Sequence, residues 1–345
     1  MTKNSSQAQV QSEPSQSVGF AAALEQLDPQ TAIALATKAE ANGFKGVLAS
    51  ERSQPWVPAQ GQASFSWSVL GALGMNTTGN LMSGTTIPGY RWHPSLVAQA
   101  SATIAAMFPG RHLLAIGSGE AIDEHVVGGY WPETAERIDR MFESIEIIQK
   151  LFNASIADRD AKHSGKYFKL ESTRLWTMPL AAPQILVATS GPVTAKRAGR
   201  TADGLLIDGA PIERIPQLFQ KFQDGAHEVG KKPGNMAVRL HLSWASTTEE
   251  AMRNAREQWP IGGLRFPRSD IRSPFEFEQL AKMIRDEDFE GKMTISSDPD
   301  EHRAEIQKYL DLGFDQVYLH NVGRNQEEWI EVFGRDVLPK LGLRR

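Results

Sequence analysis

The sequence predicts an α/β protein in which eight parallel strands, each followed by a helix, close into a (β/α)8 TIM barrel. Three observations indicate this fold. Eight short apolar runs recur along the chain, helical patterns separate them, and the length of 345 residues suits one such barrel. A doubly wound parallel sheet also alternates strands with helices, and it is the alternative fold.

Each apolar run has the length and composition of a buried parallel strand. We expect strands at residues 18–22, 46–50, 80–86, 112–118, 184–189, 204–208, 238–243 and 316–320. Apolar residues at helical spacing predict helices at residues 28–43, 94–107, 133–152, 193–202, 212–229, 248–258, 299–312 and 326–341. The first helix begins at Asp28-Pro29, where Asp28 is a good N-cap and proline suits the first turn.

Two connections are too long to be plain links between a strand and a helix. Residues 153–182 follow the helix after the fourth strand, and residues 260–292 lie between the seventh and eighth strands. Connections of this length in a compact domain are usually functional or disordered. We expect insertions on the C-terminal face of the barrel, which is where the active sites of such barrels form.

Composition and charge exclude several classes of protein. The chain is 41% hydrophobic and 23% charged, with a net charge of -4, so no basic excess indicates a nucleic-acid partner. No apolar run is long enough to cross a membrane. The absence of cysteine excludes thiolate metal ligands and a cysteine nucleophile. The eight histidines show no paired helical spacing, so we expect no metal site.

Residues 1–17 differ in composition from the rest of the chain. They are rich in serine and glutamine and nearly lack apolar side chains, which predicts a disordered tail before a single barrel domain at residues 18–345. They contain neither an apolar core segment nor a twin arginine, so we expect no export signal and a cytoplasmic location.

The strongest chemical signal is the stretch of residues 116–124. The apolar run at residues 112–116 leads into Gly117 and Gly119, and a carboxylate, Glu120, follows. This pattern predicts a strand that opens into a tight turn, where small residues let a flat polar ligand lie against the backbone. A carboxylate beside such a ligand is partly desolvated and can hold its proton near neutral pH. The alternative is an ordinary strand-to-helix turn with a solvated glutamate.

Other polar groups follow the ends of the predicted strands, so a barrel would collect them on one face. They are Glu51-Arg52, Gly84-Thr85-Thr86, Ser190-Gly191-Pro192, Asp208 and Ser243-Trp244. The free amides of the helix after Ser190 could bind a phosphate, or Ser190 could simply cap that helix. Trp56 could line a pocket or only pack its loop.

The second long connection carries four cationic side chains, at Arg265, Arg268, Arg272 and Lys292. On the C-terminal face of a barrel, they could bind an anionic ligand. The alternative is a solvated, charged loop without a ligand.

Several short motifs occur in the order found in one known family. Residues 50–56, S-E-R-S-Q-P-W, resemble the S-D-H-x-Q-P-W segment of coenzyme F420-dependent glucose-6-phosphate dehydrogenases and their hydroxymycolic acid dehydrogenase relatives, which belong to the luciferase-like superfamily. Residues 90–100 are similar to its R-Y-x-P…AQA stretch, and residues 117–124 to G-T-G-E-x-L-N-E. Residues 191–204 resemble its G-P…AGR…DG pattern. The resemblance covers nearly the whole chain after the tail.

The resemblance implies a barrel that is usually dimeric and binds the deazaflavin coenzyme F420 at its mouth. It implies a non-prolyl cis peptide bond at Gly84-Thr85 and a phosphate site at the turn of residues 189–192. The implied coenzyme-binding residues are Glu51, Gly84, Thr85, Thr86, Ser118, Gly119, Glu120, Asp123, Ala188, Thr189, Ser190, Gly191 and Pro192.

Several of the predicted site residues have expected roles in catalysis and substrate binding. We expect Glu120 to donate or accept a proton and Trp56 to line the substrate pocket. Arg52, which stands where relatives carry histidine, is expected to bind an oxyanion or a carbonyl group. Glu51 would keep the contact that the family's aspartate makes with the coenzyme. Trp56, Arg268 and Lys292 are the expected substrate-binding residues.

The sequence departs from the family at two places that bear on the substrate. Relatives carry Asp-His where this chain has Glu51-Arg52, and a guanidinium group cannot replace histidine as a general base. Asp208 lies near the positions of the family's phosphate-binding threonine and lysine, where its charge would repel a phosphate.

These observations predict an F420-dependent oxidoreductase that transfers a hydride between F420 and a small-molecule alcohol, sugar or carbonyl compound other than glucose 6-phosphate. One alternative is an FMN-dependent monooxygenase of the luciferase-like type. The other is a deazaflavin-binding protein without turnover.

Overall fold

The computed structural model describes residues 16–344, and a closed parallel β-barrel forms its centre. Around the barrel the strand order is β1 (Ser17–Ala22), β2 (Val47–Ser50), β3 (Leu81–Thr86), β4 (His112–Ile116), β7 (Gln184–Ala188), β8 (Gly204–Asp208), β9 (Asn235–Trp244) and β11 (Gln316–Asn321). Pairing of β9 with β8 and of β11 with β1 closes the ring. The predicted TIM barrel is therefore confirmed, since a doubly wound sheet would have two free edges.

Helices surround the barrel at the places where the apolar periodicity predicts them, with ends that shift by a few residues. They are α1 (Pro29–Ala41), α3 (Pro94–Met107), α5 (Thr134–Ile156), α6 (Pro192–Thr201), α7 (Ile215–Glu228, after η2 Ile212–Arg214), α8 (Thr248–Gln258) and α10 (Pro299–Leu312). The last predicted helix ends early: α11 (Gln326–Val332) continues as η5 (Phe333–Val337) and η6 (Leu338–Lys340). The sequence analysis missed α2 (Ser66–Asn76), whose two glycines obscure the helical pattern.

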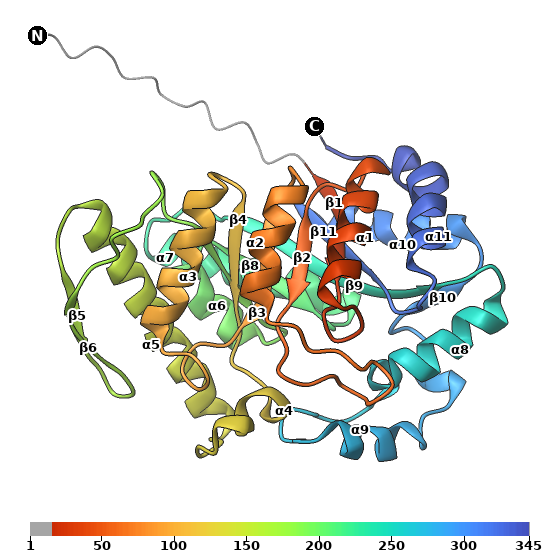
Figure 1. Cartoon of the computed structure of the whole chain (residues 1–345), viewed down its shortest axis with the longest axis horizontal. Coiled ribbons are helices and arrows are strands. Elements are labelled where there is room, and N and C mark those ends of the chain that lie inside the picture. Colours follow the sequence, from red (N-terminus) through yellow and green to blue (C-terminus); the bar gives the residue numbers. More distant parts are fainter. Residues whose placement is uncertain (1–15, 345) are drawn as a thin grey trace, which may run out of the picture.

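Both long connections contain secondary structure. Residues 153–182 include the hairpin β5 (Ala161–Ser164) and β6 (Lys169–Thr173), which is fixed to the side of α5 because Glu143 accepts hydrogen bonds from backbone amides such as that of Phe168. Residues 260–292 include η3 (Pro260–Gly263), α9 (Pro274–Ala281) and η4 (Asp286–Phe289), and β10 (Thr294–Ser296) follows. Figure 1 shows α9 together with α4 (Ala121–Glu124) beyond the carboxyl ends of the strands, while β1 begins at the opposite end. The helix η1 (His125–Val127) follows α4.

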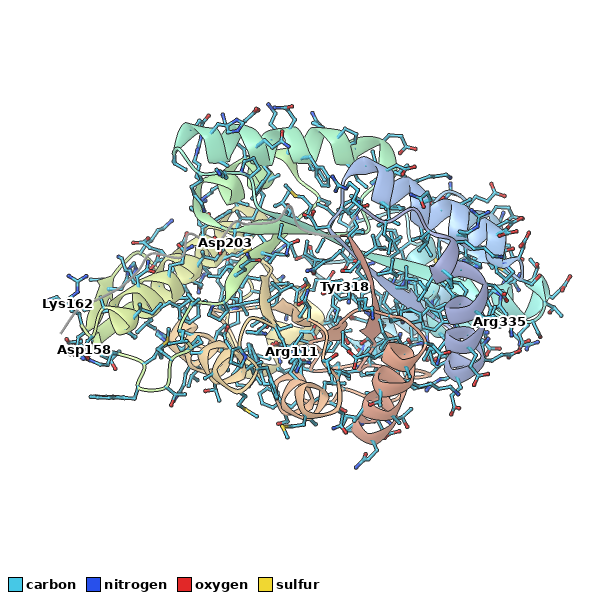
Figure 2. The ribbon with its side chains drawn as sticks, turned by 90° about the horizontal axis from the view of Figure 1, so that it is seen from above. Arg111, Asp158, Lys162, Asp203, Tyr318 and Arg335 are labelled. Atoms are coloured by element: carbon cyan, nitrogen blue, oxygen red, sulfur yellow. The ribbon has the colours of Figure 1, made fainter. Side chains whose placement is uncertain are left out.

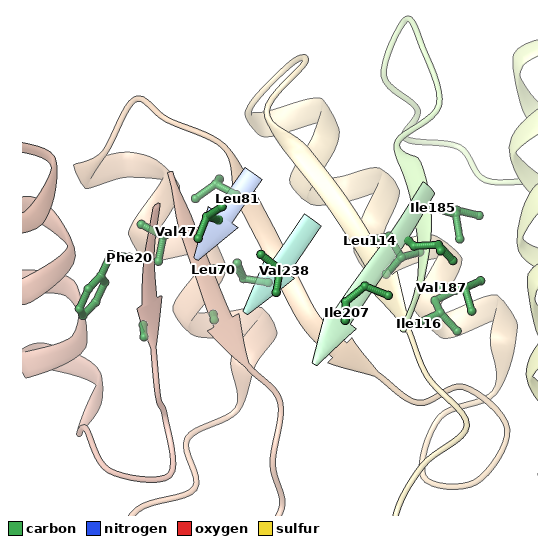
Figure 3. Packing of buried hydrophobic residues seen from close by; sticks show 14 of the residues in the cluster. Phe20, Val47, Leu70, Leu81, Leu114, Ile116, Ile185, Val187, Ile207 and Val238 are labelled. Carbon is green, nitrogen blue, oxygen red and sulfur yellow. The ribbon is translucent and has the colours of Figure 1, made fainter. Parts of the chain in front are cut away.

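Side chains of the strands alternate between two apolar cores, as the period of two in a strand requires. The barrel interior is filled by Ala21, Leu48, Met82, Leu113, Ala115, Leu186, Leu206, Ala237 and Tyr318. Tyr318 lies near the middle of the molecule in Figure 2. Residues of opposite orientation, such as Phe20, Val47 and Ile207, pack toward the helices (Figure 3). At Gly19, a Cβ atom would lie 2.6 Å from the Tyr318 ring, so this strand position needs glycine.

The first barrel strand begins one residue earlier than the sequence predicts. Ser17 is the first residue of β1, and the Gln16 side chain donates hydrogen bonds to the carbonyls of Leu310 (2.7 Å) and Phe314 (2.8 Å). The rest of the predicted tail, residues 1–15, lies outside the described residues. Within residues 16–344, no helix is long and apolar enough to cross a membrane.

Candidate active site

A pocket of about 450 Å³ opens at the carboxyl ends of the barrel strands. That volume lies within the range of small-molecule sites. Most residues predicted for the site line it: Glu51, Arg52, Trp56, Gly84, Thr85, Ser118, Gly119, Glu120, Asp123, Ala188, Thr189, Ser190, Gly191 and Arg268. Of the other predicted residues, Thr86 lies behind the lining and donates to Glu51, Pro192 begins α6, and Lys292 is bound elsewhere. The convergence of strand ends expected for a barrel is therefore present.

Glu120 occupies the turn between β4 and α4, and it is a bound carboxylate rather than a solvated one. The backbone of Gly119 has φ +91°, and a Cβ there would lie 2.8 Å from Ile87, so only glycine fits this turn. Arg52 donates to Oε2 of Glu120 at 3.3 Å, and Arg268 donates to Oε1 at 3.2 Å. Two guanidinium groups from distant loops thus hold the carboxylate at the pocket wall.

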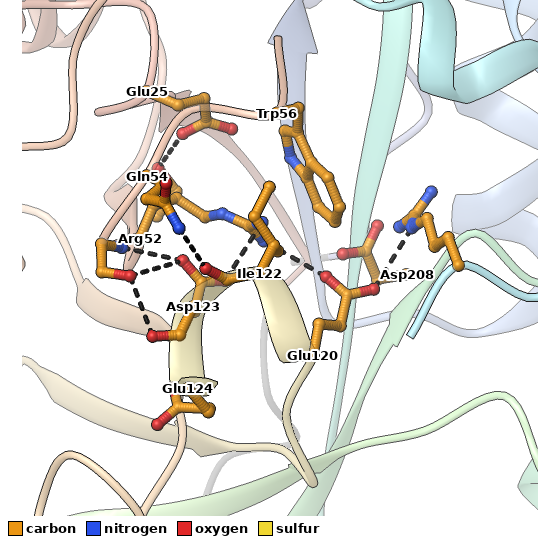
Figure 4. A network of polar contacts seen from close by, with 12 residues as sticks. Glu25, Arg52, Gln54, Trp56, Glu120, Ile122, Asp123, Glu124 and Asp208 are labelled. Atoms are coloured by element: carbon orange, nitrogen blue, oxygen red, sulfur yellow. Dashed lines mark hydrogen bonds and ion pairs between the residues drawn. The ribbon is translucent and has the colours of Figure 1, made fainter. Parts of the chain in front are cut away.

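Arg52 and Trp56 form one packed unit beside Glu120 (Figure 4). The guanidinium carbon of Arg52 lies 3.6 Å from the centre of the Trp56 ring, and Nη2 of Arg52 lies 3.1 Å from Asp123. Trp56 is buried and packs edge-on against Trp259 and Phe277, yet it also lines the pocket. Both roles considered for Trp56, packing its loop and lining a pocket, are therefore present. Arg52 supplies a fixed positive charge that cannot accept a proton.

Glu51, Arg91 and Glu124 form a largely buried charged cluster, in which Glu51 lines the pocket and the other two residues do not. Nη2 of Arg91 lies 3.0 Å from Glu124 and 3.5 Å from Glu51, which also accepts a hydrogen bond from Thr86 at 2.8 Å. Burial raises the pKa of Glu51, and it raises the pKa of Glu124 to about 7 although Arg91 acts in the opposite direction. The sequence pattern does not indicate that Arg91 and Glu124 pair, because only the fold brings the two motifs that contain them together.

A second charged pair joins β8 and β9: Asp208, which the sequence predicts at this face, and Arg239, which its pattern does not single out. Asp208 and Arg239 are cross-strand neighbours, and Nη2 of Arg239 donates to Oδ2 of Asp208. His241 Nε2 lies 3.1 Å from Oδ1 of Asp208, and His241 Nδ1 lies 2.8 Å from His320 Nδ1. Burial opposes the charge on Asp208, but Arg239 and His241 outweigh it and hold its pKa well below the usual value. The available signal was Arg239 and His241, which are spaced by two and alternate with apolar residues in the middle of the strand.

Other parts of the pocket lining present backbone amides and hydroxyl groups. The Gly84-Thr85 peptide bond is cis, as the family resemblance implies, and both residues line the pocket. Thr189 Oγ1 accepts a hydrogen bond from the Gly191 amide at 3.0 Å. Within the described chain, the N-cap of α6 is Gly191 and makes no side-chain cap bond, so Ser190 does not cap this helix. The turn therefore keeps helix amides available for an anion.

Of the four candidate cationic residues in the loop of residues 260–292, Arg268 lines the pocket. Arg268 reaches Glu120, whereas Arg265 pairs with Asp288 at 2.7 Å. Lys292 donates to the carbonyls of Gly263 (2.9 Å) and Leu264 (3.1 Å), and like Arg272 it does not line the pocket. The structure therefore brings Arg268, but not Lys292, to the predicted substrate site.

Two further charged residues, Arg137 and Glu25, line the pocket. Arg137 on α5 lines the pocket and donates to Ser269 Oγ at 3.0 Å, which fastens the loop of residues 260–292 over the pocket. Glu25, after β1, also lines the pocket and accepts a hydrogen bond from Ser50. Among residues 16–344, no group of three or more histidine, aspartate or glutamate side chains is arranged to hold a metal ion.

Comparisons with known proteins agree on one relationship. The model of the family described as luciferase-like monooxygenase matches residues 5–316. A protein from Nakamurella multipartita named F420-dependent glucose-6-phosphate dehydrogenase is 32% identical over 329 residues, which cover 94% of this chain and 96% of that protein. A protein of the same name from Mycolicibacterium gilvum is also 32% identical, with 94% and 97% covered.

Solved structures agree with the sequence relatives. An F420-dependent secondary alcohol dehydrogenase in complex with an F420-acetone adduct superposes with a TM-score of 0.88 at 28% identity, covering 95% of this chain and 99% of that chain. The oxygenating constituent of 3,6-diketocamphane monooxygenase from Pseudomonas putida, in complex with FMN, has a TM-score of 0.70 at 18% identity. The second likeness shows the fold alone.

Proposed function

The chain belongs to the luciferase-like monooxygenase family, and from this premise we propose that it is a coenzyme F420-dependent oxidoreductase. It transfers a hydride between F420 and an alcohol, sugar or carbonyl compound other than glucose 6-phosphate. One observation carries the proposal: a single pocket holds both the amide-rich turn at Thr189–Gly191 and a carboxylate, Glu120, fixed between Arg52 and Arg268.

The pocket residues suit the parts of F420. The turn at residues 189–191 and the first amides of α6 suit its phosphate group, because helix N-termini bind anions. Gly117 and Gly119 bring no side chain to the pocket lining, so a flat ring system can lie against the backbone there. Glu51 lines the same wall and can keep a contact with the coenzyme. When bound, F420 supplies a two-electron hydride transfer, and the protein supplies orientation and the proton.

Proton transfer, substrate binding and exclusion of water are assigned to three residues of the pocket: Glu120, Arg52 and Trp56. Glu120 exchanges the proton with the substrate oxygen, since it is a half-buried carboxylate fixed at the pocket wall. Arg52 binds the substrate oxygen with its fixed charge, and Trp56 excludes water from one side of the pocket. One of the substrate-binding cations implied by the family resemblance does not reach the pocket, because Lys292 donates hydrogen bonds to backbone carbonyls instead. This supports a substrate other than glucose 6-phosphate.

A titration of the purified protein with F420 and FMN tests the coenzyme assignment. We expect quenching of F420 fluorescence with a dissociation constant at least about tenfold lower than that for FMN. The matched variant is Gly191→Val, which places a side chain at the phosphate turn and should weaken F420 binding. Preferential binding of FMN would move the protein to the monooxygenase alternative. Binding of F420 without any single-turnover bleaching across a broad substrate screen would instead support the binding protein without turnover.

We also propose a homodimer, because large apolar side chains are exposed on the adjacent helices α2 and α3. Met75 is 74% exposed, and Leu96 and Met107 are 52% and 50% exposed. We expect a dimer in sedimentation velocity, and we expect Met75→Glu with Leu96→Glu to give a monomer. The control is Met283→Glu, since Met283 is equally exposed at 74% on another part of the surface. A wild-type monomer at micromolar concentration would contradict the proposal.

A cytoplasmic location is proposed together with this function, and cell fractionation is the measurement that checks it.

A further inference from the structure

Arg239 presents one nitrogen to the charged end of the pocket and has no role in the chemistry described above. Its side chain is 14% exposed and lines the pocket. Nη2 donates to Asp208, and Nε is buried without a partner. Among the described residues, Nη1 makes no hydrogen bond, so it is the guanidinium nitrogen that remains for a ligand.

The position of Arg239 is fixed from several sides. Asp208 lies directly across the strand pair, and His241 holds the other oxygen of this carboxylate at 3.1 Å. His241 in turn contacts His320, whose Nε2 lies 2.7 Å from Gln26 Oε1. A carboxylate held on both oxygens cannot rotate away, so Arg239 stays in place without a ligand.

The charges around Arg239 are already balanced. Arg52 and Arg268 are paired with Glu120, and Arg239 is paired with Asp208. Glu25 and Asp123 add further carboxylates to the lining. An anionic substrate group would therefore meet no unpaired positive charge here and would be repelled by these carboxylates. A neutral hydroxyl or carbonyl oxygen needs only the free N–H group of Arg239.

We propose that Arg239, held by Asp208, binds an uncharged oxygen of the substrate, and that this pair makes the pocket select neutral hydroxyl or carbonyl compounds over phosphorylated or carboxylated ones. The inference rests on the proposed function, and it names the substrate class of the same pocket. Asp208 acts as the charge-selecting residue because it neutralises Arg239.

The test uses inorganic phosphate as the probe and calorimetric titration of the F420-loaded protein. For the wild type, we expect a dissociation constant weaker than about 10 mM. Asp208→Asn keeps the shape of the side chain but releases the charge of Arg239, so we expect phosphate to bind at least about tenfold more tightly. In the double variant Asp208→Asn with Arg239→Met, this gain should disappear.

A matched control makes the same change at an exposed pair. Asp286 pairs with Arg256 on the surface, so Asp286→Asn should not change the affinity for phosphate. Thermal unfolding and F420 affinity should be measured for every variant, and Asp208→Ser replaces Asp208→Asn if the latter does not fold. Equal phosphate binding by the wild type and Asp208→Asn would overturn the inference. If phosphate still binds more tightly to the double variant than to the wild type, the inference is also overturned, because phosphate would then bind at a site other than Arg239.

Failure of the proposed function gives a different result. If F420 does not bind at all, the proposed function fails, and the phosphate titration can be run on the coenzyme-free protein. The phosphate-binding turn is common to all variants, so the difference between the single and the double variant still reports on Arg239.

Discussion

Replacing Glu120 by glutamine is expected to lower kcat by about 10²- to 10⁴-fold, which is the usual loss when a general acid or base is removed. Glutamine keeps the shape of the side chain, and its single carbonyl oxygen can still accept a hydrogen bond from either Arg52 or Arg268. It cannot exchange the proton that must leave or reach the substrate oxygen. F420 affinity should change little, because the substitution leaves the phosphate turn at residues 189–191 unchanged.

Steady-state kinetics with any substrate found in an F420 absorbance screen, together with a fluorescence titration of F420, measures both quantities. The matched control is Glu257→Gln, the same change at an exposed position on α8, and its kcat should equal that of the wild type. Near-wild-type kcat in Glu120→Gln would remove Glu120 from the proton transfer. Glu51, which is buried but lines the same pocket, would then be the next carboxylate to test.

Replacing Arg91 by methionine is expected to lower the free energy of unfolding by about 3–5 kcal/mol, the usual cost of leaving a buried ion pair with one partner. Both Glu51 and Glu124 would lose the guanidinium that lies 3.5 Å and 3.0 Å from them. Chemical denaturation measures the change. Arg335→Met is the control, because Arg335 pairs with Asp336 on the exposed surface and its loss should cost less than about 0.5 kcal/mol.

The decrease in the free energy of unfolding caused by Arg91→Met should become larger as the pH rises. The pKa of Glu124 is already raised by burial to about 7, and removing the positive charge of Arg91 raises it further. A carboxyl group with a raised pKa in the folded state binds more protons there than in the unfolded state, so stability falls as pH rises through this range. The gap between wild type and variant should therefore be larger at about pH 8 than at about pH 6. An equal gap at both pH values would show that the carboxyl groups escape to solvent in the variant.

The local pattern of the sequence was sufficient to predict most of the barrel. The run at residues 204–208 and the strand β8 coincide, and the predicted helix at residues 299–312 is α10 to the residue. The turn at Gly119-Glu120 could also be predicted from the sequence. A glycine that can adopt positive φ and the carboxylate that follows it are adjacent residues, so the signal is local. The helix α2 was missed, since Gly71 and Gly74 weaken a pattern that tertiary packing against the barrel restores.

The partners of the charged residues were decided by the tertiary structure alone. Arg239 and Asp208 lie 31 residues apart in the chain, and Arg268 and Glu120 lie 148 apart. Hydrophobic periodicity is local information, because it reports which face of one strand or helix is buried. An ion pair instead depends on which strands become neighbours and how far water is excluded between them. For this reason the sequence by itself determined the fold and the position of Glu120, whereas only the closed barrel determined that Arg268 and not Lys292 reaches the pocket, and that Asp208 neutralises Arg239.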